Sequence, residues 1–285
     1  MAQLLLVVAL SITAAGFAQT APVRRPGAQN DARAAERQRD ASFESKSLGR
    51  SMRYRVLLPA GYSASLRRFP VIYLLHGLDG SYTDWTTRTN LADFARALPL
   101  IIVMPDAHNA WYTNSAADAA ARYEDYVLVD LPSEIDARYR TIQSRDGRAI
   151  AGLSMGGYGA IKMALKRPGQ FAVAGSFSGA FDVARDPAFA TAFPKETEHI
   201  GAIFGPEGGA ARRDNDPFAL ARTVRAASVP YLYLDCGTSD AFVASNHELA
   251  AVLREAGLAY EYHEVGGGHT WDYWNARVRL SSSTW

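Results

Sequence analysis

Two glycines flank a serine in the segment Gly152-Leu-Ser-Met-Gly156, and this short motif constrains the fold more than any other feature of the chain. The residues from 148 to 153 form a mostly apolar run that predicts a β-strand, and those after the motif have the spacing of a helix. A serine between a strand and a helix lies on a tight turn, where a side chain at either glycine position would clash. The motif therefore predicts a strand–turn–helix unit with Ser154 at the turn.

Apolar runs alternate with helical patterns along most of the chain. The β-branched and aromatic content of these runs, with turn signals at their ends, predicts eight strands. We expect these strands at 42–48, 51–58, 70–76, 100–105, 148–154, 173–178, 231–236 and 260–265. Gly49 is expected in a hairpin turn between the first two. Helices are expected at 82–98, 123–139, 155–166, 245–256 and 270–280. For the helix at 245–256, Ser245 to Glu248 has the pattern of a capping box, and Gly257 predicts its end.

The central runs, such as 71–75 and 101–104, are apolar throughout. A strand needs such a sequence when both faces of its sheet are covered, as in a parallel sheet. Strands that alternate with helices predict an α/β protein with a mostly parallel sheet and helices on both faces. The 285 residues could form one large domain or two small ones. We expect one, over 42–285, because candidate functional residues extend from 76 to 269.

The stretch 180–229 interrupts this alternation. It contains four prolines and four glycines, which predict short helices and loops rather than another strand–helix pair. Open α/β sheets bind ligands beyond the carboxyl ends of their strands. We therefore expect this insertion to lie near the functional site and to shape its pocket.

The first 18 residues have the pattern of a secretory signal peptide. Residues 4–10 form a compact apolar segment, and small residues at 16 and 18 precede a potential cleavage site before Gln19. The segment 4–17 is too short and too interrupted by polar residues to span a membrane. The sequence thus predicts a signal peptide at 1–18 and a secreted or periplasmic protein without a membrane partner.

The next segment, 19–41, is rich in Ala, Arg, Gln and Pro and has no apolar periodicity, so we expect a flexible linker. Five arginines lie between 24 and 39, and without interleaved aromatic residues they favour a solvated linker over a nucleic-acid-binding arm. The whole chain has 30 basic and 29 acidic residues, a net charge of +1. This balance gives no broad attraction to nucleic acid or anionic membranes. The single cysteine, Cys236, lies in an apolar run and is expected to be buried.

Ser154, on its strand–turn–helix unit, is a candidate nucleophile. An acyl-transfer site also needs two N–H groups that point at the developing oxyanion. One is expected from Met155, directly after the serine, and the other from Leu78, in the loop that follows the third strand. His76, at the start of that loop, could act as a base, but its place at a strand end before a glycine turn favours a structural residue that braces the loop.

The general base should be one of six histidines, at positions 76, 108, 199, 247, 263 and 269. In folds that carry this serine motif the chain order is serine, acid, histidine, which leaves the last four. His247 and His263 fall in a predicted helix and a predicted strand, and His199 lies in the irregular insertion. His269 follows three glycines after the last strand, on a loop that can carry its side chain to the serine, so we predict it as the base.

Asp235 and Asp240 compete for the role of the acid. Asp235 lies within the predicted strand 231–236, whereas Asp240 lies on the loop beyond it. A carboxylate on the loop can reach the second nitrogen of the histidine, hold its tautomer and stabilise its charged form. The sequence therefore favours Asp240. Serine, acid and histidine then follow the fifth, seventh and eighth strands, the order expected of an eight-stranded α/β-hydrolase fold.

Several longer strings resemble the esterase D branch of the α/β hydrolases. They are Gly152-Leu-Ser-Met-Gly-Gly-Tyr-Gly-Ala160, Asp235-Cys-Gly-Thr-Ser-Asp240, Gly267-Gly-His-Thr-Trp-Asp-Tyr-Trp274, His76-Gly-Leu-Asp-Gly-Ser-Tyr-Thr-Asp-Trp85, Trp111-Tyr-Thr-Asn-Ser115 and Tyr123-Glu-Asp-Tyr126. The resemblance covers about residues 42 to 277. This branch includes tributyrin-type esterases, S-formylglutathione hydrolases, feruloyl and acetylxylan esterases, and mycolyltransferases. The resemblance implies Ser154, Asp240 and His269 as a catalytic triad, in agreement with the residues read individually.

Substrate contact is expected from Trp111, because it follows a strand end on the same edge of the sheet as the candidate catalytic residues, although packing in the core would also explain it. No pair of histidines and carboxylates has the spacing of a zinc site, and no phosphate-binding or dinucleotide fingerprint is present. We therefore expect no metal and no cofactor.

The sequence as a whole predicts a serine carboxylesterase that hydrolyses short-chain or aromatic acyl esters of small molecules through an acyl-enzyme on Ser154. The alternatives are a thioesterase of the S-formylglutathione hydrolase type, an acyltransferase, and a feruloyl or acetylxylan esterase. A binding module without catalysis is a further alternative, which the presence of all three triad residues disfavours.

Overall fold

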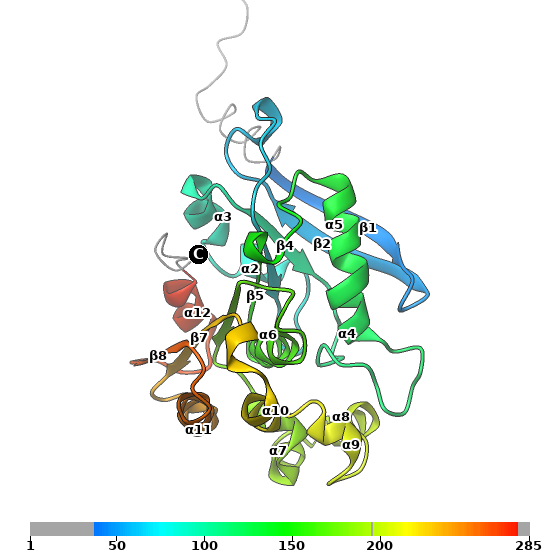
Figure 1. Cartoon of the computed structure of the whole chain (residues 1–285), viewed down its shortest axis with the longest axis vertical. Coiled ribbons are helices and arrows are strands. Elements are labelled where there is room, and N and C mark those ends of the chain that lie inside the picture. Colours follow the sequence, from blue (N-terminus) through cyan, green and yellow to red (C-terminus); the bar gives the residue numbers. More distant parts are fainter. Residues whose placement is uncertain (1–36, 195, 279–285) are drawn as a thin grey trace, which may run out of the picture. The chain divides into compact units, whose positions relative to one another are not determined.

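The computed structural model describes residues 37–194 and 196–278 (Figure 1). The signal peptide predicted at 1–18 and most of the linker predicted at 19–41 lie outside the described residues. The strands are β1 (Gln38–Ser45), β2 (Arg50–Leu57), β3 (Val71–Leu75), β4 (Ile101–Pro105), β5 (Arg148–Leu153), β6 (Val173–Phe177), β7 (Tyr231–Gly237) and β8 (Tyr260–Val265). The α-helices are α2 (Asp84–Thr87), α3 (Leu91–Phe94), α4 (Tyr123–Asp125), α5 (Leu131–Arg138), α6 (Met155–Lys166), α7 (Pro187–Ala192), α8 (Thr197–Phe204), α9 (Ala210–Arg213), α10 (Pro217–Thr223), α11 (Val243–Glu255) and α12 (Trp271–Arg277).

All eight strands belong to one sheet, in the order β1-β2-β4-β3-β5-β6-β7-β8. β2 is antiparallel to both of its neighbours, and every other pair from β4 to β8 is parallel. The carboxyl ends of the parallel strands therefore meet at one edge, and the register brings Leu75 opposite Gly152. The eight-stranded, mostly parallel sheet predicted from the sequence is confirmed.

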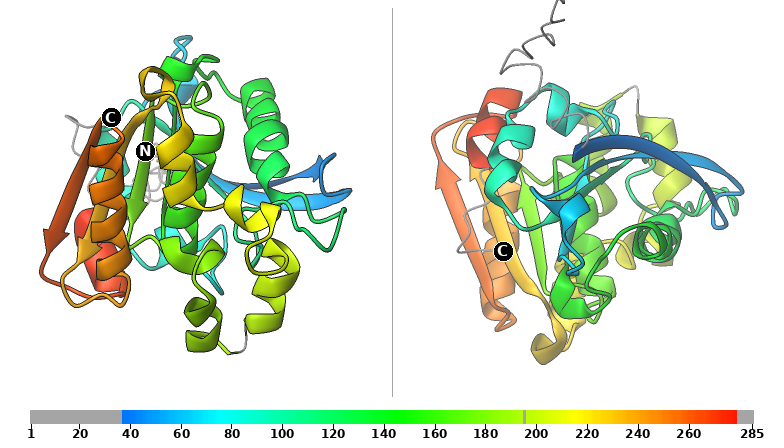
Figure 2. Two further views of the ribbon diagram at one scale, coloured as in Figure 1. Left: turned by 60° about the horizontal axis from the view of Figure 1, so that its bottom comes forward. Right: turned by 90° about the horizontal axis from the view of Figure 1, so that it is seen from above.

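Helices cover both faces of this sheet, and β3 shows why its sequence is apolar at every position. Val71, Tyr73 and Leu75 pack into one hydrophobic cluster together with residues of α5, α6 and α11. Ile72 and Leu74 point to the opposite face and pack with residues of α2, α3 and α12. Because successive side chains of a strand alternate between faces, a central strand can satisfy two such layers only with a continuous apolar run. Figure 2 shows the two layers from two further directions.

The first strand begins earlier than the sequence predicted. β1 starts at Gln38, so residues 38–41 belong to the sheet and not to the linker, and the predicted boundary between 41 and 42 is wrong. The polar sequence of this segment hides the strand, because β1 lies at the edge of the sheet and pairs only with β2. The hairpin between the two strands turns at Gly49, whose φ of 61° suits glycine.

Two of the predicted helices are interrupted. The segment 82–98 forms the short helices α2 and α3 and the 3-10 turn η2 (Ala95–Ala97), with a bend between α2 and α3. The segment 123–139 passes from α4 through a π-helical turn, η3 (Tyr126–Asp130), into α5. Local periodicity predicts helical character but not the changes in hydrogen-bond pattern that packing imposes. Pro132 lies in the middle of the predicted helix 123–139. In the structure it stands in the first turn of α5, where its missing N–H is tolerated.

The predicted capping box at Ser245 is wrong. α11 begins at Val243, so Ser245 lies inside the helix, where its hydroxyl donates to the carbonyl of Phe242. The end of the helix agrees with the prediction, because Gly257 follows it with a φ of 67°.

The described residues between β6 and β7 form α7, α8, α9 and α10 and the 3-10 turns η5 (Phe181–Ala184) and η6 (Ala226–Ser228), and none of them belongs to a strand. It begins at the carboxyl end of β6, beside the turn that carries Ser154, since the N–H of Ala180 donates to the carbonyl of Ser154. Among the described residues, no helix has both the length and the apolar character needed to cross a membrane.

Candidate active site

Ser154 lies on the sharp turn between β5 and α6. Its φ of 52° and ψ of −117° are strained for a residue with a side chain. The turn is closed by the two glycines of the motif. A Cβ on Gly152 would stand 2.5 Å from the backbone of Gly156, and a Cβ on Gly156 would stand 2.6 Å from the carbonyl oxygen of Leu75. The glycines therefore allow close contact between the turn, the helix and the neighbouring strand, and the serine side chain projects at the carboxyl edge of the sheet.

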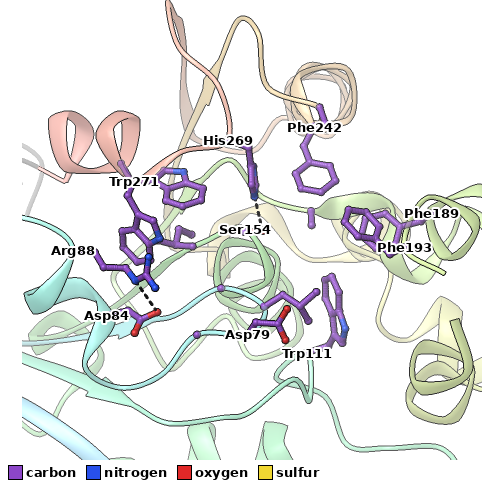
Figure 3. Close-up of a pocket in the computed structure, with 17 residues that line it drawn as sticks. Asp79, Asp84, Arg88, Trp111, Ser154, Phe189, Phe193, Phe242, His269 and Trp271 are labelled. Carbon is purple, nitrogen blue, oxygen red and sulfur yellow. Dashed lines mark hydrogen bonds and ion pairs between the residues drawn. The ribbon is translucent and has the colours of Figure 1, made fainter. Parts of the chain in front are cut away.

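Three side chains predicted as a triad form a continuous hydrogen-bonded chain. His269 Nε2 lies 2.9 Å from Ser154 Oγ (Figure 3). On the other side of the ring, His269 Nδ1 lies 2.9 Å from Asp240 Oδ2. The three residues come from the loops after β5, β7 and β8. An ionised carboxylate can only accept a hydrogen bond, so His269 Nδ1 carries the proton that it donates to Asp240. His269 Nε2 is then free to accept the proton of the serine hydroxyl. The arrangement can thus generate a serine nucleophile.

Asp240 is buried at the end of this chain, with 3% of its surface exposed. Burial raises the pKa of the Asp240 carboxyl, but the hydrogen bonds from His269 and from the N–H of Phe242 outweigh burial and lower this pKa below its usual value. The carboxyl therefore stays ionised beside the imidazole. An ionised carboxylate fixes the ring orientation and stabilises an imidazolium that forms during proton transfer.

Asp235, the rejected candidate for the acid, has different partners. It is fully buried in β7 and accepts hydrogen bonds from Arg277 Nε at 2.6 Å, from Tyr233 Oη at 2.9 Å and from the hydroxyl of Tyr273. Arg277 and Tyr273 belong to α12, which follows the loop that carries His269. Asp235 thus anchors this helix to the sheet and makes none of these bonds to His269.

The other histidines bond elsewhere. His263 Nε2 lies 2.7 Å from Glu261, and His199 Nε2 lies 2.9 Å from the carbonyl of Asn109. His247 is exposed near Glu264, and His108 is exposed near Asp106. Only His269 is paired with Ser154 among the hydrogen bonds of the described residues.

The loop predicted to supply an oxyanion donor lies against the serine turn. A Cβ on Gly77 would stand 2.6 Å from the side chain of Leu153 and 3.5 Å from Ser154 Cβ. Leu78, the next residue, lines the same cavity as Ser154. Met155 is the first residue of α6, where the backbone N–H groups have no partner within the helix and the helix dipole favours negative charge. The backbone at Leu78 and the backbone at Met155 thus both lie beside Ser154.

His76 braces this loop. It is buried, its Nε2 accepts the N–H of Ala107 at 3.0 Å, and its Nδ1 lies 2.7 Å from the carbonyl oxygen of Gly77. Because Nε2 accepts, the proton is on Nδ1 and the ring is neutral. Burial lowers the pKa of His76, which also favours the neutral form.

A cavity of about 430 Å³ opens at Ser154 and His269. Its wall includes the aromatic side chains of Trp111, Phe189, Phe193, Phe242, Trp271 and Trp274. Figure 3 shows the three phenylalanines on one side of Ser154, and Arg88, Asp84 and Trp271 on the other. The cavity therefore has an apolar side and a side that carries charged groups.

The phenylalanines form a stack that the sequence did not reveal as part of the site. Phe189 packs on Phe193 with ring centroids 4.9 Å apart and on Phe242 with centroids 5.8 Å apart. Phe242 also stands edge-to-face to His269 at 5.0 Å. The positions of Phe189 and Phe193, one helical turn apart in the insertion, and of Phe242, directly after the loop of Asp240, are the signals that could have indicated them.

Trp111 lines the cavity, yet only 2% of its surface is exposed. Its ring is packed edge-to-face against Tyr158, Phe189 and Phe204, with centroids 5.8, 5.6 and 6.4 Å away. Packing in the core therefore accounts for most of its surface, and its contact with the cavity is limited to the remainder. Within the part of the chain that the structure describes, no group of three or more histidine, cysteine or acidic side chains is arranged to hold a metal ion.

Comparison with known proteins places the chain among esterases. The model of the family described as "Putative esterase" matches residues 45–280. Esterase Rv1288 of Mycobacterium tuberculosis (strain ATCC 25618 / H37Rv) is 34% identical over 248 residues, which are 80% of this chain and 54% of that protein. The chain thus spans about half the length of this relative. An acetyl esterase of Caldicellulosiruptor saccharolyticus is 29% identical over 220 residues, 73% of this chain and 79% of that protein.

Among solved structures, the substrate-bound fluorophosphonate-binding serine hydrolase FphF of Staphylococcus aureus is similar, with a TM-score of 0.76 and 26% identity over 85% of this chain and 95% of that chain. The sheet of this chain therefore has the α/β-hydrolase fold, and the resemblance to the esterase D branch is confirmed. The family model covers the sheet from β2 to β8 and all three residues of the hydrogen-bonded chain, and the protein belongs to this esterase family.

Proposed function

We propose that this protein is a serine carboxylesterase with Ser154 as nucleophile, His269 as general base and Asp240 as the residue that orients the histidine. The observation that carries the proposal is the hydrogen-bonded chain from Ser154 Oγ through His269 to Asp240, in which Ser154 and His269 line a cavity with an apolar side. Membership of the esterase family supports the same chemistry.

In the proposed acylation, His269 Nε2 removes the proton of Ser154 while Oγ forms a bond to the carbonyl carbon of the ester. The carbonyl oxygen becomes an oxyanion, which the N–H groups of Leu78 and Met155 stabilise. When the tetrahedral intermediate collapses, the bond to the alcohol oxygen breaks and the alcohol takes the proton from His269. An acyl group then remains on Ser154.

In the proposed deacylation, a water molecule gives a proton to His269 and its oxygen attacks the acyl carbon. The second tetrahedral intermediate uses the same two N–H groups and collapses with release of the carboxylic acid, while Ser154 recovers its proton from His269. Asp240 keeps its charge throughout and stabilises the imidazolium in both steps, in accordance with its lowered pKa.

We propose short-chain or aromatic acyl esters of small molecules as substrates. The volume of about 430 Å³ and the stacked phenylalanines favour a small or planar apolar acyl group. The similarity to an acetyl esterase supports a small acyl group. Trp111 would contribute the part of its ring that faces the cavity.

We further propose that residues 1–18 direct the chain out of the cytoplasm, that the linker ends before β1, and that the protein acts in the periplasm or the medium without nucleic-acid or membrane partners. The support is the apolar segment at 4–10, the small residues before Gln19, and the balanced charge of the chain. The insertion between β6 and β7 contributes Phe189 and Phe193 to the cavity and is proposed to set the acyl preference.

The test is hydrolysis of a series of p-nitrophenyl esters from acetate to palmitate, with p-nitrophenyl benzoate, methyl ferulate and S-formylglutathione beside them. The proposal predicts the highest kcat/KM for acetate, butyrate or benzoate and a steep fall for longer chains. Dominant turnover of S-formylglutathione would replace it with a thioesterase, and ester formation from added alcohols in preference to hydrolysis would replace it with an acyltransferase. No turnover of any substrate would contradict an esterase of small molecules.

A further inference from the structure

The loop of Leu78 faces a second loop in which several residues have left-handed backbone conformations. His108, Trp111 and Tyr112 have φ values of 47°, 53° and 51°, and Asp79 in the facing loop has a φ of 56°. Residues with side chains rarely adopt such conformations unless the surrounding structure holds them there. The contacts between these two loops therefore have to hold their backbones in these unfavourable conformations.

Tyr112 joins the two loops from inside the protein. Its side chain is fully buried, and its hydroxyl donates a hydrogen bond to the carbonyl oxygen of His76 at 2.9 Å. His76 directly precedes Gly77 and Leu78, so this bond is made to the backbone from which the loop begins. The ring of Tyr112 is fixed against α6, because a Cβ on Gly159 would stand 2.7 Å from it. Tyr112 thus connects the start of the Leu78 loop to the helix that follows Ser154.

The backbone of Tyr112 is held by a buried charge. Lys162 of α6 has no exposed surface, and its ammonium group donates to the carbonyl oxygen of Tyr112 at 2.6 Å and to Thr113 Oγ1 at 3.0 Å. Its third bond goes to Glu124 at 2.7 Å. All three donors of the ammonium are therefore used, and two of them fix the segment Tyr112–Thr113. A buried ammonium is costly unless each donor is satisfied, which makes this arrangement a specific constraint on the loop.

The outer end of the Leu78 loop is fixed as well. The N–H of Asp79 donates to Asn109 Oδ1 at 2.8 Å, and Asn109 Nδ2 donates to Asp79 Oδ1 at 2.8 Å. Leu78 therefore lies between two attachment points, the carbonyl of His76 and the backbone of Asp79. The first attachment is made by Tyr112, which Lys162 holds, and the second by Asn109 in the same loop as Tyr112.

We propose that Tyr112 is a positioning residue for the reaction, which sets the orientation of the Leu78 N–H through its hydrogen bond to the carbonyl of His76. An oxyanion donor is effective only when it is held in place before the charge develops. Gly77 and Gly80 make the backbone of the loop permissive, and within the loop the carbonyl of Gly77 accepts from His76 Nδ1 and from the N–H of Gly80. The hydroxyl of Tyr112 adds a restraint from outside the loop, at the carbonyl of His76, and Lys162 fixes the position of Tyr112.

The test compares Tyr112→Phe with a matched control, Tyr158→Phe. Both tyrosines are fully buried and each donates its hydroxyl to a backbone carbonyl, but Tyr158 donates to Asn215 at 2.8 Å, away from the Leu78 loop. Removal of a whole oxyanion donor lowers kcat by about 10²- to 10³-fold, so a displaced donor is expected to lower it by about tenfold to a hundredfold. Tyr112→Phe should show this fall with KM nearly unchanged, and Tyr158→Phe should not.

Active-site titration with a fluorophosphonate, followed to completion, gives the fraction of competent Ser154 in each variant. A loss of folded enzyme would lower this fraction, whereas the proposed role lowers kcat per titrated site. Equal kcat per site in the two variants would overturn the inference. Asn109→Ala, which removes the outer attachment from a partly exposed position, provides a second variant with the same expected direction if Tyr112→Phe does not fold.

This inference rests on the proposed esterase function for its kinetic readout, so a second measurement is independent of activity. Amide hydrogen exchange of peptides that span residues 76–80 should be faster in Tyr112→Phe than in the wild type and in Tyr158→Phe. Unchanged exchange in Tyr112→Phe would overturn the inference even if the protein is an esterase. Faster exchange in a protein without ester turnover would support the positioning role and contradict the proposed function instead.

Discussion

Asp240 and Asp235 both lie at the carboxyl end of β7, yet Asp240 accepts hydrogen bonds from His269 and Asp235 accepts them from Arg277. The backbone turns directly after Gly237, the last residue of β7, where a Cβ would stand 2.4 Å from the carbonyl oxygen of Gly267. This close approach brings the loop of Asp240 beside the loop of His269. Removal of the Asp240 carboxylate is therefore expected to lower catalysis, and removal of the Asp235 carboxylate is expected to lower stability.

Asp240→Asn should lower kcat by about 10⁴-fold, because an amide no longer holds the proton on His269 Nδ1 and no longer stabilises the imidazolium. The free energy of unfolding should change much less, since the amide has a similar shape. Steady-state kinetics on p-nitrophenyl butyrate and a denaturant titration measure the two quantities. A variant with nearly normal kcat would show that Asp240 does not orient the base.

Asp235→Asn should lower the free energy of unfolding and leave kcat nearly unchanged. It removes the charge that pairs with Arg277, and loss of one partner of a buried ion pair costs about 3 kcal/mol of unfolding free energy. The kcat per titrated active site should stay close to the wild-type value, because none of the bonds of Asp235 described above reaches His269 or Ser154. A fall in kcat without a fall in stability would reverse the assignment of the two carboxylates.

Acid should destabilise the protein through Glu124. Burial raises the pKa of this carboxyl, but the ammonium groups of Lys162 and Lys166 outweigh burial and lower its pKa to about 2 from an unfolded value near 4.5. A lowered pKa in the folded state means stability that is present above pH 4.5 and is lost as the pH falls toward 2, about 3 kcal/mol in all.

The measurement for Glu124 is the unfolding free energy at pH 6 and pH 3 for the wild type and for Glu124→Gln. The variant should be less stable at pH 6, since Lys162 loses its buried counter-charge, and its stability should fall less on acidification. The difference between the two pH responses isolates Glu124 from the other carboxylates. Parallel responses would show that Glu124 does not carry the acid sensitivity.

Phe193→Ala should reduce activity on aromatic acyl groups selectively. Phe193 is partly exposed, lines the cavity and stacks on Phe189. Loss of this apolar contact is expected to lower kcat/KM for p-nitrophenyl benzoate by about tenfold, while p-nitrophenyl acetate, which is too short to reach it, is affected little. Leu66→Ala, an exposed leucine outside the cavity lining, is the control. A parallel fall for both esters would argue against an acyl-binding role.

Much of the fold could be predicted from local patterns because the central strands are buried on both faces and their sequences show it. The sequence also indicated the side chains at positions 154, 240 and 269, since each follows a strand at the carboxyl edge of the sheet. The start of β1 was missed because an edge strand with polar residues has no such signature. The breaks within 82–98 and 123–139 were missed because they depend on packing between distant segments.

The buried polar contacts could not be predicted in the same way. Glu124 and Lys162 are far apart in the sequence, and only the tertiary structure brings them together. A lysine within the otherwise buried helix 155–165 was a usable signal, because a charged residue on a buried face needs a partner. The aromatic side chains of the cavity could not be predicted because two of them, Phe189 and Phe193, come from an insertion whose sequence has no helical or strand periodicity.

Turnover by Ser154→Ala tests most directly whether Ser154 is the nucleophile of an esterase. The variant should fold like the wild type, because alanine replaces a single hydroxyl without filling the turn. Its kcat on p-nitrophenyl butyrate should be at least about 10⁴-fold lower than that of the wild type, measured at equal concentrations of folded protein. Turnover close to the wild-type value would contradict the account, because the hydrogen-bonded chain to His269 would then serve no nucleophile.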